Sequence, residues 1–368
     1  MFFVRDSSKT SLGSGGYLRS LQIAEIVAQA SHSLVDFSQC ALTPTTRSGR
    51  FERWQIMRRL SARADVGDSG DRSRNKKTAM GYKLIGELMD SVARVDAFIW
   101  ERTQRHGGLA AARERGIPTV AVGHNLESLV PTETLLYSDG GLHDRFAAEC
   151  GQLALADHRV VISSRDQWLL ALFGVESIVL PYHPPQHRLH ALRQVRARRQ
   201  QPGRHKRVLI MGNAMYPPTY EGMRHLLQVL IGGGLTGGAT SVDVMGFGAE
   251  RLAADCTGDG IVFHGAVSDV HMFNLMTTAT AAIVYQKTGT GALTRIPDFL
   301  AAGLPVLANP CAARAHEHLE GVHLFHDDAD LVGVVESLDT QALPAEPAFP
   351  ERAAQRFIAC LEQGGCRN

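Results

Sequence analysis

Short apolar runs alternate along the chain with longer segments in which apolar residues recur at every third or fourth position. Runs of four or five apolar residues are typical of strands buried on both faces of a parallel sheet, and the longer segments are typical of helices that cover such a sheet. In the first half of the chain, strands are predicted at residues 2–5, 97–100, 119–122, 160–163 and 177–180. Helices are predicted between them at residues 19–29, 80–92, 142–154 and 165–173.

The same alternation begins again after a polar segment. Residues 184–206 open with two consecutive prolines and are rich in Arg, Gln and His, so we expect an interdomain linker there, with a helix at residues 188–199. In the second half we expect an apolar segment at 222–230, strands at 207–211, 241–245, 260–264, 281–285 and 306–308, a helix around Pro297 and a closing helix at 350–363. The pattern therefore predicts an N-terminal α/β domain at residues 1–183, a C-terminal α/β domain at 207–345, and a closing helix and tail at 346–368.

Residues 50–83 depart from this regularity and are predicted to be an insertion in the first domain. Apolar residues recur there at helical spacing among arginines: Phe51, Trp54, Met57 and Leu60 lie among Arg53, Arg58, Arg59 and Arg63. Residues 65–77 follow, and their polar, glycine-containing sequence predicts a mobile loop. The amphipathic stretch is interpreted either as a helix packed on the domain or as an element that faces the acceptor or a membrane surface.

Composition limits the class of protein. The chain has 368 residues, of which 44% are hydrophobic and 20% are charged, and its formal net charge is +1. These values suit two folded domains and give no concentrated charge of one sign, so nucleic acid is not expected as a partner. Charge directly after the first two phenylalanines, and the lack of an apolar run of about 18 residues, predict a cytoplasmic protein. The six cysteines form no Cys-x-x-Cys pair, which predicts reduced thiols and no metal site.

The sequence TGTGALTRIPDFLAAGLPVLAN, residues 288–309, holds the strongest chemical signal. It joins a glycine-rich turn, one arginine, a short helix with one carboxylate and a Gly-Leu-Pro-Val step into a buried strand. Glycines let a ligand approach the backbone closely, and a helix N-terminus presents N–H groups and the positive end of its dipole to an anion. A ligand with phosphates and hydroxyls is therefore expected over this turn.

Three stretches of the second half resemble, in their order and spacing, the nucleotide-binding half of the GT-B glycosyltransferases of family 4, also called group 1. They are residues 207–227, 242–269 and 288–309. In the first half, the glycine-rich loop LGSGGYLRSL and the segments GIPTVAVGHNLES and ADHRVVISSRDQ are similar to the same family. The resemblance covers nearly the whole chain apart from residues 50–83. It implies two Rossmann-like parallel-sheet domains that face each other across a cleft, with the donor bound mainly by the C-terminal domain.

The resemblance implies roles for residues of the glycine-rich turn. Arg295, three residues before Asp298, stands where the family places a lysine that binds the diphosphate, and Asp298 matches a glutamate that binds the ribose hydroxyls. Thr290 stands where the family has another glutamate, so backbone N–H groups are expected to hold the sugar or phosphate oxygens instead. The turn residues expected at the donor are Gly289, Thr290, Gly291 and Ala292. The alternatives are a solvated arginine before a helix, and an aspartate favoured in a first turn by the helix dipole.

His124 lies at the end of an apolar strand, where family members direct a histidine at the donor sugar. A histidine that only caps the strand end is the alternative. His124, Thr290 and Arg295 are the candidates for catalysis. Where many members carry an arginine and a lysine that grip the diphosphate, this chain has Gly212, Asn213 and, further on, Glu221, so the phosphate clamp is expected to be thin.

The remaining candidates are assigned by position in the family pattern alone. Donor binding is expected at Gly15, Gly16, Gly212, Asn213 and Phe247. The acceptor side is expected at Arg19, Asn125 and Glu127.

The implied activity is retaining transfer of a sugar from a nucleotide-diphosphate-sugar. The donor substrate is expected to be UDP-, GDP- or dTDP-linked, with no cofactor, and the leaving phosphate takes the acceptor proton. A glycan, a lipid-linked glycan or a small molecule is expected as acceptor, in polysaccharide or glycoconjugate biosynthesis. Peripheral binding to the cytoplasmic membrane face suits a lipid-linked acceptor.

Three other readings stay open. The substitutions at Thr290, Asn213 and Glu221 fit a catalytically silent partner subunit of an active transferase. A UDP-sugar 2-epimerase shares the GT-B architecture, although no additional set of acidic and histidine residues for it is visible. A DNA-modifying transferase of phage type also shares the architecture, and the near-neutral charge argues against it.

Overall fold

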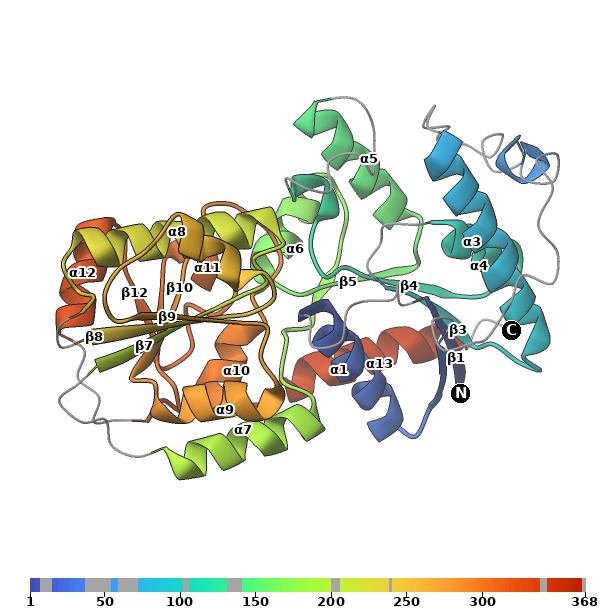
Figure 1. Ribbon diagram of the computed structural model, residues 1–368. Coiled ribbons are helices and arrows are strands. Elements are labelled where there is room, and N and C mark those ends of the chain that lie inside the picture. Colours follow the sequence, from blue (N-terminus) through green and yellow to red (C-terminus); the bar gives the residue numbers. More distant parts are fainter. Residues whose placement is uncertain are drawn as a thin grey trace. The chain divides into compact units, whose positions relative to one another are not determined.

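The computed structural model in Figure 1 describes residues 1–6, 15–36, 54–58, 72–101, 106–130, 141–199, 206–237, 240–337 and 343–365. The chain forms two compact units. The first consists of Met1–Pro181 together with Pro350–Asn368, and the second of Tyr182–Phe349. Each unit contains a six-stranded parallel sheet with helices on both faces. No helix in the described ranges is long and apolar enough to cross a bilayer.

The sheet of the first unit has the order β2-β1-β3-β4-β5-β6. Its strands are β1 (Phe2–Asp6), β2 (Ser33–Asp36), β3 (Ala97–Glu101), β4 (Thr119–Val122), β5 (His158–Val161) and β6 (Ile178–Val179). All of its pairings are parallel, and the central strands β3 and β4 are buried at every position. The order reverses between β1 and β3, so this pair of strands is the switch point of the sheet, where ligands of such folds bind.

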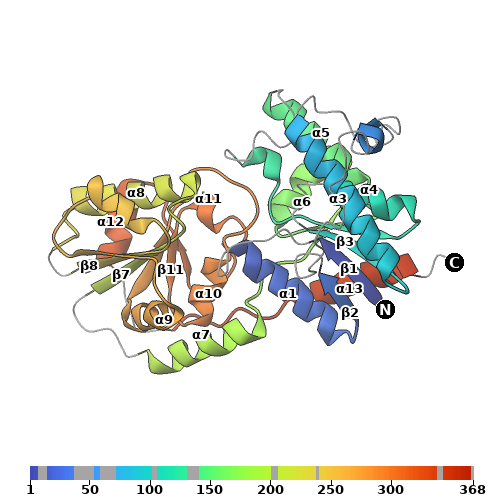
Figure 2. The same ribbon diagram turned by 45° about the vertical axis from the view of Figure 1, so that its right-hand side comes forward.

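Helices cover both faces of this sheet. On one face lie α3 (Arg72–Ser91), α4 (Gly107–Glu114), α5 (Leu142–Ala154) and α6 (Ser164–Ala171), whose apolar residues share one core with β1, β3, β4 and β5. On the other lie α1 (Gly15–Gln29) and α13 (Glu351–Gly365) (Figure 2). In α13, the predicted closing helix, Ala354, Phe357 and Leu361 recur at helical spacing and are buried, which returns the end of the chain to the first unit.

The region of residues 50–83 differs in part from its prediction. The mobile loop predicted for residues 65–77 is wrong over its second part, because α3 begins at Arg72. Residues 72–77 are acceptable helix formers placed directly before an apolar segment that packs on α4, and this packing extends the helix. The contact is tight, since a Cβ at Gly107 would lie 2.1 Å from the carbonyl oxygen of Thr78. Residues 65–71 lie outside the described residues.

A short helical segment, residues 54–58, represents the amphipathic stretch of this region. Ile56 and Met57 pack against Ala79, Tyr82 and Ala111, as expected for a helix packed on the domain. Trp54 is exposed, with the guanidinium of Arg58 over its ring. Contact of this segment with an acceptor or a membrane stays a prediction, and Phe51, Arg53, Arg59, Leu60 and Arg63 lie outside the described residues.

The sheet of the second unit has the order β12-β11-β10-β7-β8-β9. Its strands are β7 (Lys206–Met211), β8 (Thr240–Met245), β9 (Ile261–Gly265), β10 (Ala281–Val284), β11 (Val306–Ala308) and β12 (Val322–Leu324). Numbered within the unit and read from the β9 edge, this is the order 3-2-1-4-5-6 of doubly wound dinucleotide-binding sheets. The order reverses between β7 and β10, so a ligand is expected at the carboxyl ends of these two strands.

The second unit has an apolar core on each face of its sheet. One core joins the sheet to α7 (Gln186–Arg198), α9 (Asp269–Thr278) and α10 (Arg295–Ala301). The other joins it to α8 (Pro217–Gly232), α12 (Asp328–Glu336) and the 3-10 helix η4 (Ala249–Ala254). Successive side chains of a strand point to opposite faces of the sheet, so Val208 packs in one core and Leu209 in the other. Val242 on β8 packs in the same core as Val208.

Local sequence sets several helix starts in this unit. Ser268 and Asp327 cap α9 and α12 by accepting hydrogen bonds from the N–H groups of His271 and Asp330.

The helix predicted at residues 188–199 is α7, and its Leu189, Leu192 and Val195 are buried in the core of the second unit. The segment expected to be a linker thus contains a packed helix.

Candidate functional site

Two glycines form the floor of the site in the second unit. Gly212 follows β7 and Gly246 follows β8, and their backbones are in direct contact. Gly246 has φ +130°, and a Cβ at this position would lie 1.9 Å from the carbonyl oxygen of Gly212. Only glycine fits there, because any other residue would be both strained and in collision with the backbone. The loops after β7 and β8 therefore pack backbone against backbone beside the switch point.

Arg295, the first residue of α10, lies over this floor. Its Nη1 is 3.5 Å from the position that a Cβ of Gly212 would occupy. Within the described residues, its guanidinium forms no ion pair, and its buried Nε has no hydrogen-bond acceptor. Burial, and then the charge of Arg314, lower the pKa of Arg295 to about 10. An uncompensated cation at a sheet switch point is suited to an anionic ligand.

Arg314 organises the glycine-rich turn that follows β10. Its guanidinium is buried and donates to the carbonyl oxygens of Gly291, at 3.0 Å, and of Thr290, and to the side-chain oxygen of Gln286 at 2.7 Å. Gly289 and Gly291 have φ values of +145° and +70°, which favour glycine. Thr290 and Ala292 are half-buried beside them. The cation thus fixes the turn through its carbonyl groups and adds positive charge near Arg295.

His316 is a further buried group near this turn that the sequence did not single out. It is 3% exposed and forms a hydrogen bond with the backbone of Leu293. Burial, followed by the charges of His318 and Arg314, lowers the pKa of His316 to about 3. The imidazole is therefore neutral at physiological pH and leaves the local positive charge to the two arginines.

Asp298 is 1% exposed, and both of its oxygens have partners within the second unit. Tyr182 donates its hydroxyl at 3.1 Å, and the Nε of Arg188 donates at 3.0 Å. Burial raises the pKa of this carboxyl above its ordinary value, while Arg188 and Tyr182 act in the opposite direction. A contact between Asp298 and ribose hydroxyls stays a prediction, and it would require one of these two bonds to be exchanged.

The loops after β7 and β8 carry exposed apolar side chains. Phe247 is 63% exposed and Met215 is 51% exposed, and the N–H of Ala214 donates to the carbonyl oxygen of Phe247 at 2.8 Å. Asn213 is exposed and accepts a hydrogen bond from the N–H of Met215. An exposed aromatic ring at a strand end is suited to stacking on a nucleotide base. Glu221 lies on α8 and forms an ion pair with Arg224.

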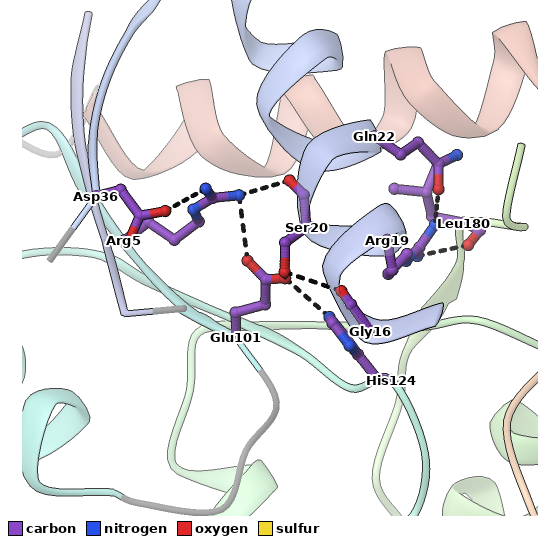
Figure 3. A network of polar contacts seen from close by, with 9 residues as sticks. All are labelled: Arg5, Gly16, Arg19, Ser20, Gln22, Asp36, Glu101, His124 and Leu180. Carbon is purple, nitrogen blue, oxygen red and sulfur yellow. Dashed lines mark hydrogen bonds and ion pairs between the residues drawn. The ribbon is translucent and has the colours of Figure 1, made fainter. Parts of the chain in front are cut away.

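In the first unit, His124 belongs to a buried polar network at the switch point of the sheet (Figure 3). Its Nε2 lies 2.8 Å from Oε1 of Glu101, which ends β3. Glu101 also accepts a hydrogen bond from the hydroxyl of Ser20 on α1, and its Oε2 lies 3.3 Å from Nη1 of Arg5 on β1. Arg5 in turn forms an ion pair with Asp36 on β2.

The loop after β4 is held by a second buried carboxylate. Glu149 on α5 accepts hydrogen bonds from the N–H groups of Glu127, at 2.8 Å, and Ser128, at 3.0 Å. These contacts fix the 3-10 helix η2 (Glu127–Leu129) that follows His124. Of the predicted acceptor-side residues here, Glu127 is buried and Asn125 is half-buried.

The start of α1 carries the other predicted residues of the first unit. Gly15 and Gly16 open the helix, and the carbonyl of Gly16 accepts a hydrogen bond from Ser20. Arg19 is buried and donates to the carbonyl oxygens of Leu180, at 2.6 Å, and Pro181, at 3.2 Å, near the end of β6. An acceptor contact of Arg19 stays a prediction and would compete with these bonds. Residues 12–14 of the glycine-rich loop lie outside the described residues.

Of the predicted donor residues, Gly212 and Arg295 lie close together in the second unit, with Asn213 and Phe247 on the adjoining loops and residues 289–292 in the turn after β10. Gly15 and Gly16 belong to the first unit, and a role of these residues at a donor stays a prediction. His124 lies at the corresponding edge of the first sheet. Arg314, Glu101 and Glu149 were not expected from the sequence. Among the described residues, no group of three or more His, Cys, Asp or Glu side chains is placed to hold a metal ion.

Comparison with known proteins shows the fold. No protein-family model matches the chain, and no curated protein matches it by sequence. Sucrose-phosphate synthase from Thermosynechococcus elongatus superposes with a TM-score of 0.63 at 14% identity, over 99% of this chain and 97% of that chain. The UDP-forming α,α-trehalose-phosphate synthase from Burkholderia xenovorans gives 0.61 at 12% identity, over 99% and 95%.

Anabaena HepE in complex with UDP gives a TM-score of 0.57 at 14% identity, over 98% of this chain and 97% of that chain. These solved proteins are glycosyltransferases with two Rossmann-like units. The chain therefore has the GT-B fold along its whole described length, and at these identities the likeness extends to the fold alone.

Proposed function

We propose that the protein is a glycosyltransferase that takes a sugar from a nucleotide-diphosphate-sugar. The observation that carries this proposal is Arg295, a half-buried cation with no anionic partner among the described residues, beside Gly212 at the switch point of a dinucleotide-type sheet. Breaking the bond between the sugar and the diphosphate leaves negative charge on the leaving group. A preformed guanidinium stabilises that charge without reorganising the site.

The remaining parts of the site have roles that follow from their chemistry. The turn at residues 289–292 lets the sugar or phosphate oxygens approach backbone N–H groups, and Arg314 keeps this turn in place through its carbonyl oxygens. Phe247 offers an aromatic surface to the base. The donor is a nucleotide-sugar of UDP type in the first instance, because the similar trehalose-phosphate synthase is UDP-forming and HepE was solved with UDP, and with UDP and glucose.

We further propose that the reaction proceeds with retention, as in family 4, and that the leaving phosphate takes the acceptor proton. The acceptor is a glycan, a lipid-linked glycan or a small-molecule sugar. The protein acts in the cytoplasm, where nucleotide-sugars are available, and a lipid-linked acceptor would place it on the cytoplasmic membrane face. No cofactor is needed for this chemistry.

A screen of UDP-, GDP- and dTDP-sugars, with release of the nucleoside diphosphate as the readout, tests the proposal. Release from at least one donor, strengthened by an acceptor sugar, is the expected result. Absence of release together with absence of binding of any nucleoside diphosphate would contradict the proposal.

A catalytically silent subunit is the second candidate function. It is favoured by Thr290, which offers no carboxylate at the turn, and by Asp298, whose oxygens are already engaged by Tyr182 and Arg188. Such a subunit would release no nucleoside diphosphate and would bind an active transferase instead. A 2-epimerase would convert the UDP-sugar without an acceptor, so analysis of the sugar product separates it from a transferase.

A further inference from the structure

Five buried side chains of the first unit form a polar network to which the proposed function assigns no role (Figure 3). Arg5, Asp36 and Glu101 come from the carboxyl ends of β1, β2 and β3, Ser20 comes from α1, and His124 follows β4. Each is less than a tenth exposed.

Glu101 is the centre of this network. Ser20 donates to its Oε1, Nε2 of His124 lies 2.8 Å from the same oxygen, and Nη1 of Arg5 lies 3.3 Å from Oε2 as an ion pair. The side chain of Glu101 is 0% exposed. Burial alone would raise the pKa of Glu101, but the hydrogen bond from His124 and the charges of His124 and Arg5 lower it below its ordinary value. Glu101 is therefore ionised and only accepts hydrogen bonds.

This charge state fixes the imidazole of His124. Because Glu101 only accepts, the Nε2 of His124 must carry a proton and donate it at 2.8 Å. The hydrogen bond made by one ring nitrogen sets the tautomer of a histidine and the orientation of its ring. The ring therefore cannot turn about its side-chain bonds without breaking a charge-assisted hydrogen bond inside the unit.

We propose that Glu101 is the positioning residue of His124, holding the imidazole just after β4 in one tautomer and one orientation. The inference rests on the proposed function, since it takes His124 as a residue that contacts a sugar substrate. Displacement of a sugar-contacting group by about 1 Å costs up to about 100-fold in rate. Glu101 acts through the histidine and does not touch the substrate.

Two variants separate positioning from a structural role. Glu101→Gln and Asp36→Asn each remove one carboxylate that pairs with Arg5, but only Glu101 contacts His124. The first readout is the ring nitrogen signal of His124 in protein labelled with ¹⁵N-histidine, identified by its loss in His124→Asn. The second is kcat and KM for release of UDP from UDP-glucose, or from the donor that the screen identifies.

Glu101→Gln is expected to move the His124 ring signals and to lower kcat by roughly 10- to 100-fold, with KM for the donor within about threefold of the parent. Asp36→Asn is expected to leave both readouts near the parent values. Unchanged ring signals in Glu101→Gln, or equal effects of the two variants, would overturn the proposal.

If Glu101→Gln does not fold, Glu101→Asp takes its place. Aspartate keeps the negative charge beside Arg5 but is one methylene shorter, so the ring signals are expected to move while the fold is retained. A parent protein that releases no nucleoside diphosphate from any donor would contradict the proposed function. The ring signals would still decide whether Glu101 positions His124, so the two failures are distinguishable.

Discussion

Replacing Arg295 with methionine is expected to remove most of the affinity for a nucleoside diphosphate without destabilising the fold. Methionine reaches about as far as the Nε of arginine and carries no charge. In the structure the guanidinium has neither an ion-pair partner among the described residues nor an acceptor for its Nε. The substitution therefore breaks no ion pair in the ligand-free protein and removes a charge that is poorly solvated.

The size of both effects follows from the structure. The pKa of Arg295 is lowered to about 10 by burial and by Arg314. Because each tenfold change in proton affinity corresponds to about 1.4 kcal/mol, the charged side chain is destabilised by roughly 3 kcal/mol in the absence of an anion. Loss of a charge-assisted contact with the diphosphate costs about 1.5–3 kcal/mol, or roughly 10- to 150-fold in affinity.

Isothermal titration with UDP and urea denaturation measure the two quantities on the same preparations. Arg295→Met is expected to bind UDP at least 10-fold more weakly and to have a free energy of unfolding equal to or above that of the parent. Arg193→Met is the matched control, because Arg193 belongs to the same unit but forms an exposed ion pair with Glu346. It is expected to bind UDP as the parent does. Parent affinity in Arg295→Met, or a loss of more than about 1 kcal/mol in its stability, would refute the assignment.

Gly246→Ala is expected to lower the free energy of unfolding by about 3 kcal/mol and to abolish UDP binding, because the alanine Cβ would collide with the carbonyl oxygen of Gly212. Gly151→Ala is the control, since a Cβ at Gly151 would meet open space, and this variant is expected to bind UDP normally. Comparable effects of the two substitutions would contradict the close approach of Gly246 to Gly212. The predicted contact of Asp298 with the ribose should make the affinity for UDP at least 10-fold higher than the affinity for 2′-deoxy-UDP, as measured by titration. Equal affinities would show that Asp298 only forms its bonds to Tyr182 and Arg188. At His316 the unfolded chain takes up a proton near pH 6.5, but the folded protein does so only near pH 3, so stability should fall as pH falls through this window by about 1.4 kcal/mol per pH unit. His316→Gln should flatten that part of the pH profile of urea denaturation, and an unchanged slope would show that the histidine does not titrate as described.

Much of the fold could be predicted from the sequence because central strands of a parallel sheet are continuous apolar runs. The strands at residues 97–100 and 119–122, and the helix at 142–154, agree with β3, β4 and α5 within one residue. The edge strands β2 and β12 were missed, since they are short and only partly buried, and their sequences lack a strong apolar signal. The helical start of α3 was missed because its polar residues resemble a loop until the packing on α4 is known.

Of the candidate site, the glycines and Arg295 could be predicted from the sequence. Glycine-rich turns and the spacing to Arg295 are local features, so one sequence is enough to find them. Arg314 is distant in sequence from the turn that it holds and has no motif of its own. The partners of Asp298 could not be predicted, because Tyr182 was assigned to the N-terminal domain and Arg188 comes from a segment whose composition resembled a linker.

The most direct test of the central claim is titration of the unmodified protein with UDP, GDP and dTDP by isothermal calorimetry at low and high salt. The account predicts saturable binding of at least one of these nucleotides, with one ligand per chain and weaker affinity at high salt, because Arg295 meets the diphosphate as a charge. No binding of any of the three at either salt concentration would contradict it.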